Sequence, residues 1–379
     1  MSRKIERIIV VLLGGCLLLA FGCQGERRSD DALREAVKSG NCPGYVAYSL
    51  ELGREEWSCM GWADAESNRQ MEIDSVFRIC SMTKSFVGAL AAVLADRGEI
   101  DLDTPISQTF PEYTGEKSDI TLRQCLSMTA GFAEMSPTML DKGIGSQNPT
   151  EVALEMAGLP LETPPGTHFK YSNASFEVAA AVLERRTGRR LDVLLDEVFF
   201  LPLGMSDTTF CPTPEIQARM AQIYRIEDGK GWIREKDPMI VRRPDGTCEW
   251  HVCASGSLFS SPLDIMKFYQ MLLRDGQSED GRTVMSEGAM RLITTKQTPP
   301  CVQVWYSFGF FKRDDRWLGH GGAYGTIAEC DLEECRMRMI FTQMYGSNVG
   351  RLLRKWRRST TEEFDEVAWM GSRFFVGEE

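Results

Sequence analysis

The stretch VFRICSMTKSFVGALAAVLADRG, residues 76–98, decides how the chain can be interpreted. Apolar side chains recur at helical spacing after Ser81, and Gly98 stands where a helix commonly ends, so we predict a helix over Met82–Arg97. Ser81 would lie at the start of this helix, and Lys84 would lie one turn further along the same face. The spacing therefore predicts a hydroxyl and an amine within reach of each other.

Ser81-Met82-Thr83-Lys84 is the only Ser-x-x-Lys sequence in the chain. The unpaired N–H groups at a helix N-terminus favour a developing negative charge near Ser81. Lys84 could act as a base if burial or a neighbouring cation lowered its pKa from about 10.4 towards neutrality. The alternative is a helix-capping serine followed by an ordinary surface lysine, because a motif this short also occurs by chance.

A second candidate element is Tyr171-Ser172-Asn173, the only Tyr-x-Asn of the chain. It precedes a predicted helix over Phe176–Thr187, so we expect a loop that presents both side chains to a cleft. A tyrosine can transfer protons, and an asparagine can hydrogen-bond an amide carbonyl or hold the lysine. The alternative is a buried tyrosine with a capping asparagine.

A third element, His320-Gly321-Gly322-Ala323, lies between strand-like segments. Glycines in a strand let another backbone approach closely. The N–H of Ala323 could act beside the N–H of Ser81 as an oxyanion donor. The alternative for His320 is a structural histidine whose hydrogen bonds are satisfied within the fold.

In this order the three elements resemble the serine β-lactamase and penicillin-recognising enzyme superfamily, in the branch of class C β-lactamases, D-alanyl-D-alanine carboxypeptidases and esterases. Sequence segments on either side of these motifs also resemble the family, so the resemblance extends over residues 44–344. It implies that Ser81 is acylated and that Lys84 and Tyr171 share the proton transfers. Asn173 would orient the substrate, and Ser81 and Ala323 would supply the oxyanion N–H groups.

One departure from that family bears on the substrate. Many β-lactamases and peptidases of the superfamily carry Lys-Thr-Gly or Lys-Ser-Gly where this chain has His320-Gly321-Gly322. A histidine attracts a substrate carboxylate less firmly than a lysine does. We therefore expect a serine hydrolase that acts through an acyl-enzyme on an ester or a D-amino-acid amide. The alternatives are a true β-lactamase and a non-catalytic sensor of cell-wall fragments.

Strand-like segments near both ends of the chain enclose a region of predicted helices. This order predicts an α+β fold, with an antiparallel sheet flanked by helices and an inserted helical lobe. Near the start, strands are expected over Gly44–Leu50 and Trp57–Trp62, and near the end one is expected over Trp305–Lys312. We expect the hydrolase domain to occupy residues 32–379.

The first residues have the features of a targeting segment. A basic start is followed by the apolar run Ile8–Phe21, which is shorter than the roughly 20 residues that span a bilayer, so we predict a signal peptide over residues 1–22. Cys23 then resembles the acylated cysteine of a bacterial lipoprotein, although Ala20 stands where that motif usually has a larger aliphatic residue. Residues 23–31 would form a tether. The alternative is an uncleaved anchor or a plain signal peptide. We expect an exported, membrane-anchored protein of the cell envelope or periplasm.

Composition narrows the possible partners. The net charge of −11 argues against nucleic acid, because binding phosphates needs clustered lysine and arginine. The expected partner is a small-molecule or peptidoglycan-peptide substrate. Twelve cysteines allow disulfides in an exported protein, including pairs such as Cys330 with Cys335 or Cys248 with Cys253, although buried thiols are the alternative. The three histidines are scattered, so we expect neither a metal site nor a cofactor.

Overall fold

The computed structural model describes residues 30–227, 231–235, 241–242, 248–249, 252–312, 316–345 and 347–360. The predicted signal peptide, Cys23 and most of the predicted tether lie outside these ranges. No helix within them is long and apolar enough to cross a membrane.

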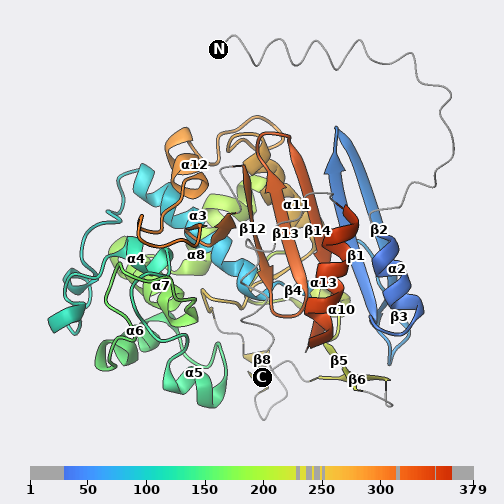
Figure 1. Ribbon diagram of the computed structural model, residues 1–379, viewed down its shortest axis with the longest axis horizontal. Coiled ribbons are helices and arrows are strands. Elements are labelled where there is room, and N and C mark those ends of the chain that lie inside the picture. Colours follow the sequence, from blue (N-terminus) through green and yellow to red (C-terminus); the bar gives the residue numbers. More distant parts are fainter. Residues whose placement is uncertain are drawn as a thin grey trace, which may run out of the picture.

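An antiparallel sheet of eight strands forms the body of the protein, in the order β10-β11-β12-β13-β14-β1-β2-β3 (Figure 1). Strand β1 pairs with β14, which places Val46 opposite Phe341 and joins the two ends of the chain. The prediction of an α+β fold with a sheet built from both ends is therefore confirmed. The strands are β1 (Gly44–Glu51), β2 (Arg54–Asp64), β3 (Arg69–Gln70), β10 (Tyr306–Ser307), β11 (Phe310–Lys312), β12 (Trp317–Gly322), β13 (Thr326–Asp331) and β14 (Arg336–Phe341).

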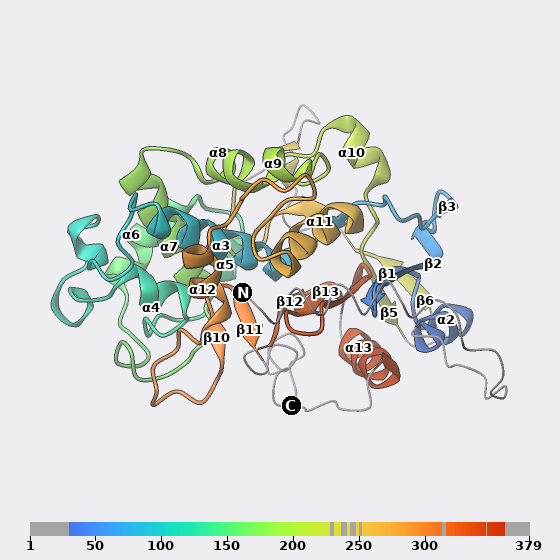
Figure 2. The ribbon, with the colours of Figure 1, turned by 90° about the horizontal axis from the view of Figure 1, so that it is seen from above.

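Helices cover both faces of this sheet (Figure 2). Because successive side chains of a strand point to opposite faces, each central strand contributes to two cores. Met339 and Phe341 of β14 belong to the large core that includes α11 (Pro262–Leu273), whereas Ile340 packs in a smaller core with α2 (Asp31–Lys38) and α13 (Ser347–Thr360). This alternation explains why β14 is apolar at successive positions.

A helical lobe is inserted between β3 and β10, and it lies to the left of the sheet in Figure 1. Its central helix is α3 (Thr83–Asp96), whose residues 83–94 are all buried. Besides α11, the other described α-helices between the sheet's two halves are α4 (Leu122–Leu126), α5 (Pro137–Lys142), α6 (Pro149–Gly158), α7 (Asn173–Thr187), α8 (Leu191–Leu195), α9 (Leu201–Leu203), α10 (Pro214–Arg219) and α12 (Glu287–Thr294).

Short strands complete the fold outside the large sheet. β4 (Phe77–Arg78), which precedes the predicted serine, pairs with β9 (Phe259–Ser260). The remaining pairs are β5 (Tyr224–Glu227) with β6 (Gly231–Arg234) and β15 (Met344–Tyr345), and β7 (Val241–Arg242) with β8 (Cys248–Glu249).

The predicted strand over Trp305–Lys312 is instead a hairpin of β10 and β11. Gly309 takes a left-handed backbone conformation with φ of +80° at the turn, which ends the first strand. The hairpin packs closely on α3. A Cβ atom at Gly309 would lie 2.0 Å from the carbonyl oxygen of Lys84, and one at Gly88 would lie 1.8 Å from that of Phe308. Two glycines thus allow the sheet edge to contact the helix that carries Lys84.

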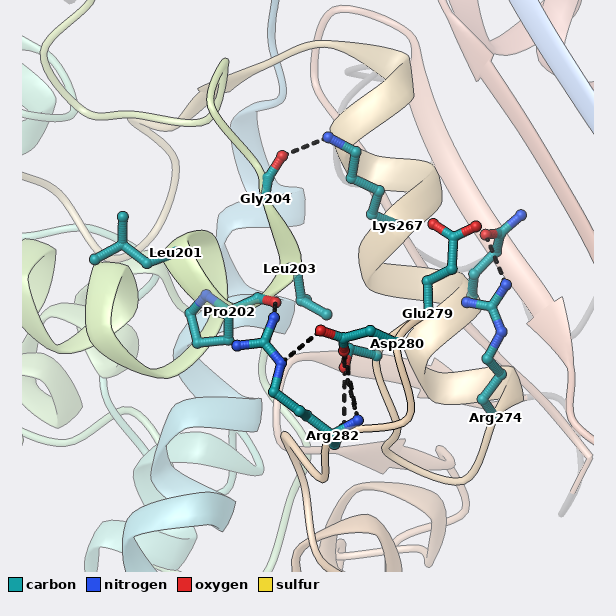
Figure 3. Close-up of a pocket in the computed structure, with 11 residues that line it drawn as sticks. Leu201, Pro202, Leu203, Gly204, Lys267, Arg274, Glu279, Asp280 and Arg282 are labelled. Atoms are coloured by element: carbon teal, nitrogen blue, oxygen red, sulfur yellow. Dashed lines mark hydrogen bonds and ion pairs between the residues drawn. The ribbon is translucent and has the colours of Figure 1, made fainter.

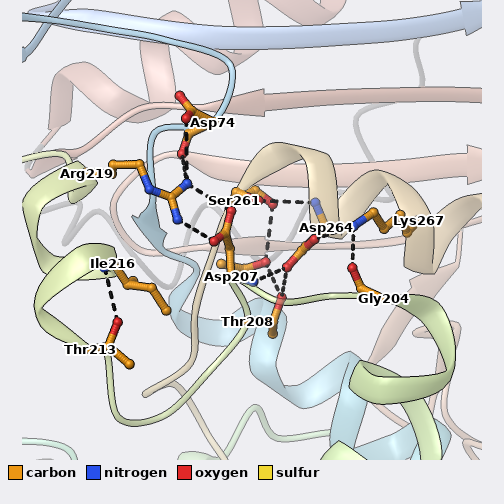
Figure 4. A network of polar contacts seen from close by, with 11 residues as sticks. Asp74, Gly204, Asp207, Thr208, Thr213, Ile216, Arg219, Ser261, Asp264 and Lys267 are labelled. Carbon is orange, nitrogen blue, oxygen red and sulfur yellow. Dashed lines mark hydrogen bonds and ion pairs between the residues drawn. The ribbon is translucent and has the colours of Figure 1, made fainter.

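A buried polar network supports the β4–β9 pair (Figure 4). The Asp264 carboxylate accepts hydrogen bonds from the backbone N–H of Asp207 at 2.7 Å and from the Thr208 hydroxyl at 3.1 Å. Its other oxygen accepts from Lys267 at 2.9 Å. Thr208 also lies 2.8 Å from the hydroxyl of Ser260 in β9. Asp264 therefore connects the start of α11 to the strand beside β4.

The cysteines with described side chains form no disulfide. The possible bridge between Cys330 and Cys335 is not formed, because Cys330 points into the large core while Cys335 is exposed at the turn after β13. Cys253 is also a free buried thiol, so the possible bridge with Cys248 is not formed either. The alternative of unbridged thiols holds for Cys42, Cys59, Cys80, Cys125, Cys211, Cys253, Cys301, Cys330 and Cys335.

Candidate active site

Ser81 lies in a 3₁₀ turn, Cys80–Met82, between β4 and α3, rather than directly at the start of an α-helix. Cys80 has a φ of +48°, a left-handed conformation that costs energy in a residue other than glycine. Neighbouring elements hold this turn. The Thr83 hydroxyl donates to the Cys80 carbonyl at 2.7 Å, and Thr326 of β13 donates to the Ile79 carbonyl at 3.2 Å. The fold therefore fixes an uncommon backbone conformation beside Ser81.

Lys84 is completely buried, and its amine contacts three oxygen atoms. Nζ lies 3.2 Å from Ser81 Oγ, 2.7 Å from Asn173 Oδ1 and 2.6 Å from the backbone oxygen of Ser255. When the amine is neutral, it can donate to the latter two and direct its lone pair at the Ser81 hydroxyl. The distances therefore suit an amine that accepts a proton from Ser81.

Burial lowers the pKa of Lys84 to about 7, because a charged ammonium loses its hydration inside the protein. The acidic groups Cys253, Glu177, Cys80 and Glu134 partly oppose this shift. Near neutral pH a substantial fraction of the amine is therefore unprotonated and able to act as a base.

Tyr171 is buried beside these groups. The Lys84 Nζ atom lies 5.0 Å from the centre of the Tyr171 ring. Burial raises the pKa of Tyr171, and a hydrogen bond with the Ser81 side chain acts in the opposite direction. The phenol is therefore neutral near pH 7, so it can pass a proton between neighbours but is not a standing phenolate base.

Tyr171 and Ser172 lie in a loop, as expected, whereas Asn173 is already the first residue of α7, so the expected loop is wrong for Asn173 alone. The preceding Ser172 caps the helix, because its hydroxyl accepts the backbone N–H of Ser175 at 3.0 Å. This cap starts the helix three residues before the predicted Phe176. Asn173 uses its oxygen to accept from Lys84, which leaves its NH₂ group as a donor.

His320 is buried in β12 against the rings of Tyr171, Tyr306 and Phe311. Its Nδ1 lies 2.7 Å from the carbonyl oxygen of Gly321, so Nδ1 carries the proton and Nε2 is an acceptor. Burial, and next the charge of Lys84, lower the pKa of His320 to about 3. This position therefore carries no positive charge at neutral pH.

The end of β12 packs against the turn that holds Ser81. A Cβ atom at Gly322 would lie 2.3 Å from the Ile79 carbonyl oxygen, so only glycine allows this approach. Ala323 follows in the turn after the strand and packs near Cys80. The residues expected to form the site thus come together from the 3₁₀ turn, α3, the loop before α7, α7, β12 and the turn after it.

Two residues of the site were not predicted. The Ser255 carbonyl contacts Lys84, but a backbone oxygen leaves no trace in the residue type, so nothing in the sequence identified it. Glu177 approaches the same segment from α7, where residues 173–183 are all buried. The one sequence signal for Glu177 was its position as a single acidic residue within a mostly apolar segment of this helix.

A cavity of about 420 Å³ lies elsewhere, between α9, α11 and the segment that follows α11 (Figure 3). Lys267, Arg274 and Arg282 line it together with Glu279 and Asp280. None of its lining residues belongs to the Ser81 site. Its charges are partly paired within the protein, as in the 2.8 Å contact between Arg282 and Asp280.

Comparison with protein families gives a match to the family described as Beta-lactamase over residues 30–358. Esterase EstB from Burkholderia gladioli is 31% identical over 238 residues, which cover 58% of this chain and 59% of EstB. The D-alanyl-D-alanine-carboxypeptidase/endopeptidase AmpH from Escherichia coli is 27% identical over 244 residues, with 59% and 57% covered. The chain thus spans under two thirds of the length of these relatives.

Among solved structures, EstCE1, a hydrolase with promiscuous acyltransferase activity, superposes with a TM-score of 0.72. The match covers 88% of this chain and 97% of EstCE1 at 20% identity. A penicillin-binding protein homologue from Pyrococcus abyssi gives a TM-score of 0.68 at 18% identity, with 83% and 73% covered. At these identities the likeness establishes a common fold.

Proposed function

Because this chain belongs to the beta-lactamase family, whose members perform serine hydrolase and acyl-transfer chemistry, we propose that it hydrolyses an ester or a D-amino-acid amide through an acyl-enzyme at Ser81. The observation that carries the proposal is the buried amine of Lys84, which lies 3.2 Å from Ser81 Oγ with its pKa lowered to about 7. A serine hydroxyl is a weak nucleophile until an adjacent base removes its proton.

In the proposed reaction, Lys84 takes the proton of Ser81 as its oxygen attacks the substrate carbonyl carbon. The N–H groups of Ser81 and Ala323 stabilise the resulting oxyanion, where loss of one donor commonly costs about 10²–10³ in rate. The proton then passes through the Tyr171 hydroxyl to the leaving oxygen or nitrogen as its bond to carbon breaks. Asn173 orients the substrate, and water later releases the acyl group by the same proton route.

The neutral state of His320 supports a substrate without an essential carboxylate. A lysine here would attract a carboxylate by charge, whereas His320, with its pKa lowered to about 3, offers only a neutral acceptor. Gly321 and Gly322 on the same strand leave room for a substrate backbone. A neutral ester therefore fits the site better than a carboxylate-bearing antibiotic.

The test is the intact mass of the folded protein after exposure to a fluorophosphonate and, separately, to a penicillin. We expect a fluorophosphonate adduct that is absent in Ser81→Ala, together with turnover of a chromogenic ester. Rapid turnover of a chromogenic cephalosporin would favour a true β-lactamase instead. Absence of any adduct on folded protein would contradict the proposal and favour a binding protein that senses cell-wall fragments.

We also propose that the protein is exported and anchored through a lipid on Cys23. The support is the basic start, the apolar run over residues 8–21 and the cysteine that follows it. Expression with a radiolabelled fatty acid in a bacterial host should label the wild type but not Cys23→Ala. Equal labelling of both proteins, or none in either, would contradict the anchor.

A further inference from the structure

Glu177 is a buried carboxylate on α7 that no step of the proposed reaction uses. It is 1% exposed and accepts three hydrogen bonds from one segment of chain. The donors are the backbone N–H of Ala254 at 3.0 Å, the backbone N–H of Ser255 at 2.8 Å and the thiol of Cys253 at 2.9 Å. All three partners are donors, which suits an ionised carboxylate because it can only accept.

These hydrogen bonds determine where the Ser255 carbonyl lies. The segment 253–255 precedes β9 and contains neither a helix nor a strand, so Glu177 provides much of its anchoring. The carbonyl oxygen of Ser255 then accepts from Lys84 Nζ at 2.6 Å. A continuous path of hydrogen bonds therefore joins the Glu177 carboxylate to the amine that contacts Ser81.

The charge of Glu177 also acts on this amine. Titratable groups face Lys84 from every side of the site: Cys80 from the 3₁₀ turn, Glu134 from the loop before α5, Tyr171 from the loop before α7, Glu177 from α7 itself, Cys253 from the segment before β9, and His320 from β12. Burial raises the pKa values of the Cys253 thiol and the Tyr171 phenol, and lowers that of His320, so these three groups are neutral near pH 7.

The carboxyl groups that face Lys84 are those of Glu134 and Glu177. Burial also raises the pKa of Glu134, which is only partly buried. Glu177 is the more deeply buried of the two, and three donors satisfy it. A charge is less screened inside the protein than at its surface, so Glu177 is well placed to stabilise a positive charge on Lys84.

We propose that Glu177 is a positioning residue for the acylation of Ser81: it holds the Ser255 carbonyl against Lys84 and stabilises the ammonium that forms when Lys84 takes the serine proton. This inference rests on the proposed function, because it requires Lys84 to act as the base. Glu177 touches neither the substrate nor Ser81, so its effect passes entirely through Ser255 and Lys84.

The experiment compares the pH dependence of fluorophosphonate labelling in wild type, Glu177→Gln and Glu177→Asp. Glutamine keeps the size of the side chain but loses its charge, and its NH₂ group cannot accept from a backbone N–H. We expect the labelling rate on the plateau of the pH profile to fall at least about tenfold. The acid limb of that profile should move down by about one pH unit, because loss of a nearby negative charge lowers the pKa of the Lys84 amine. Aspartate keeps the charge at a shorter reach, so it should lower the plateau but leave the acid limb near its wild-type position.

Glu184→Gln is the matched control. Glu184 lies on the same helix and accepts the backbone N–H of Leu191 at 2.8 Å. It is not among the acidic groups that act on the pKa of Lys84. This control should leave both the plateau and the acid limb unchanged even if it lowers the melting temperature. A merely structural role for Glu177 would likewise lower the melting temperature without moving the acid limb.

The outcomes separate the two proposals. Suppose that the wild type is labelled and Ser81→Ala is not. If Glu177→Gln then matches the wild type in both its labelling rate and its acid limb, the role of Glu177 alone is overturned. Absence of labelling in the wild type would overturn the proposed function and this role with it. If Glu177→Gln does not fold, a Glu177→Asp variant that labels at the wild-type rate would still contradict the positioning role.

Discussion

The amine of Lys84 lies 2.7 Å from the side-chain oxygen of Asn173, although 89 residues separate the two along the chain. Each residue occupies the first turn of a buried helix, α3 or α7, and those helices pack against one another within the lobe. The amine is thereby removed from water and retained by oxygen acceptors. The neutral amine that the proposed reaction requires follows from this enclosure, since burial is the main cause of its lowered pKa.

Lys84 should control the acid limb of the pH profile. Below a pH of about 7 the amine is protonated and cannot accept from Ser81, so kcat/KM for a neutral ester should fall as the pH drops through that value. Lys84→Met should lower kcat/KM by roughly 10²–10⁴. Lys84→Arg keeps the positive charge but cannot lose its proton, and it should be equally impaired. An active arginine variant would show that the charge, and not proton transfer, is what matters.

Tyr171→Phe should affect poor leaving groups more than good ones. The phenol is neutral near pH 7 because burial raises its pKa, and in the proposed reaction it delivers a proton to the departing atom. An alkoxide needs that proton, whereas a nitrophenolate does not. We expect a loss of roughly 10²–10⁴ in kcat/KM for an alkyl ester and a clearly smaller loss for a p-nitrophenyl ester. Equal losses for both would place the role of Tyr171 elsewhere in the reaction.

His320→Lys should move the preference towards carboxylate-bearing substrates. The buried imidazole is neutral, and a lysine would add one charge-assisted hydrogen bond, commonly about 1.5–3 kcal/mol. The rate of penicillin acylation relative to that of a neutral ester should rise about tenfold or more. His320→Gln adds no charge and serves as the control, with no such rise. An unchanged ratio in the lysine variant would mean that this strand does not contact the carboxylate.

Asp264→Ala should destabilise the fold without altering the chemistry of the site. Removal of this buried carboxylate leaves the N–H of Asp207 without its acceptor and leaves the amine of Lys267 with only the Gly204 carbonyl, which we expect to cost about 3 kcal/mol. Asp103→Ala breaks an exposed pair with Arg123 and should cost less than about 1 kcal/mol. Urea unfolding measures both variants. Similar losses in the two would contradict the importance of burial.

Gly88→Ala should be destabilising because the sheet edge approaches α3 at this residue. The added methyl group would collide with the Phe308 backbone, which cannot rotate away as a side chain can. Overpacking of this kind typically costs about 1–3 kcal/mol. Gly158→Ala is the control, since a Cβ atom there meets nothing within 4 Å and alanine favours a helix. Thermal unfolding should show opposite signs for the two variants.

The sequence predicted the elements whose signals are local. Apolar spacing after Ser81 and the glycine at residue 98 located α3 to within one residue at each end, and strands near both termini indicated the antiparallel sheet. Local reasoning failed where a single residue redirects the chain. Gly309 divides a predicted strand into a hairpin, and Ser172 begins α7 earlier than the apolar pattern suggests.

By itself, then, the sequence determined the order of the chemical groups and the continuous helical turns that set Ser81 beside Lys84, because a spacing of three residues is a local property. Only the tertiary structure decided the state of those groups. The pKa of Lys84, the neutral His320 and the contacts of Ser255 and Glu177 depend on which distant segments exclude water from the site. Desolvation and backbone acceptors are properties of packing, so residue types along the chain do not encode them individually.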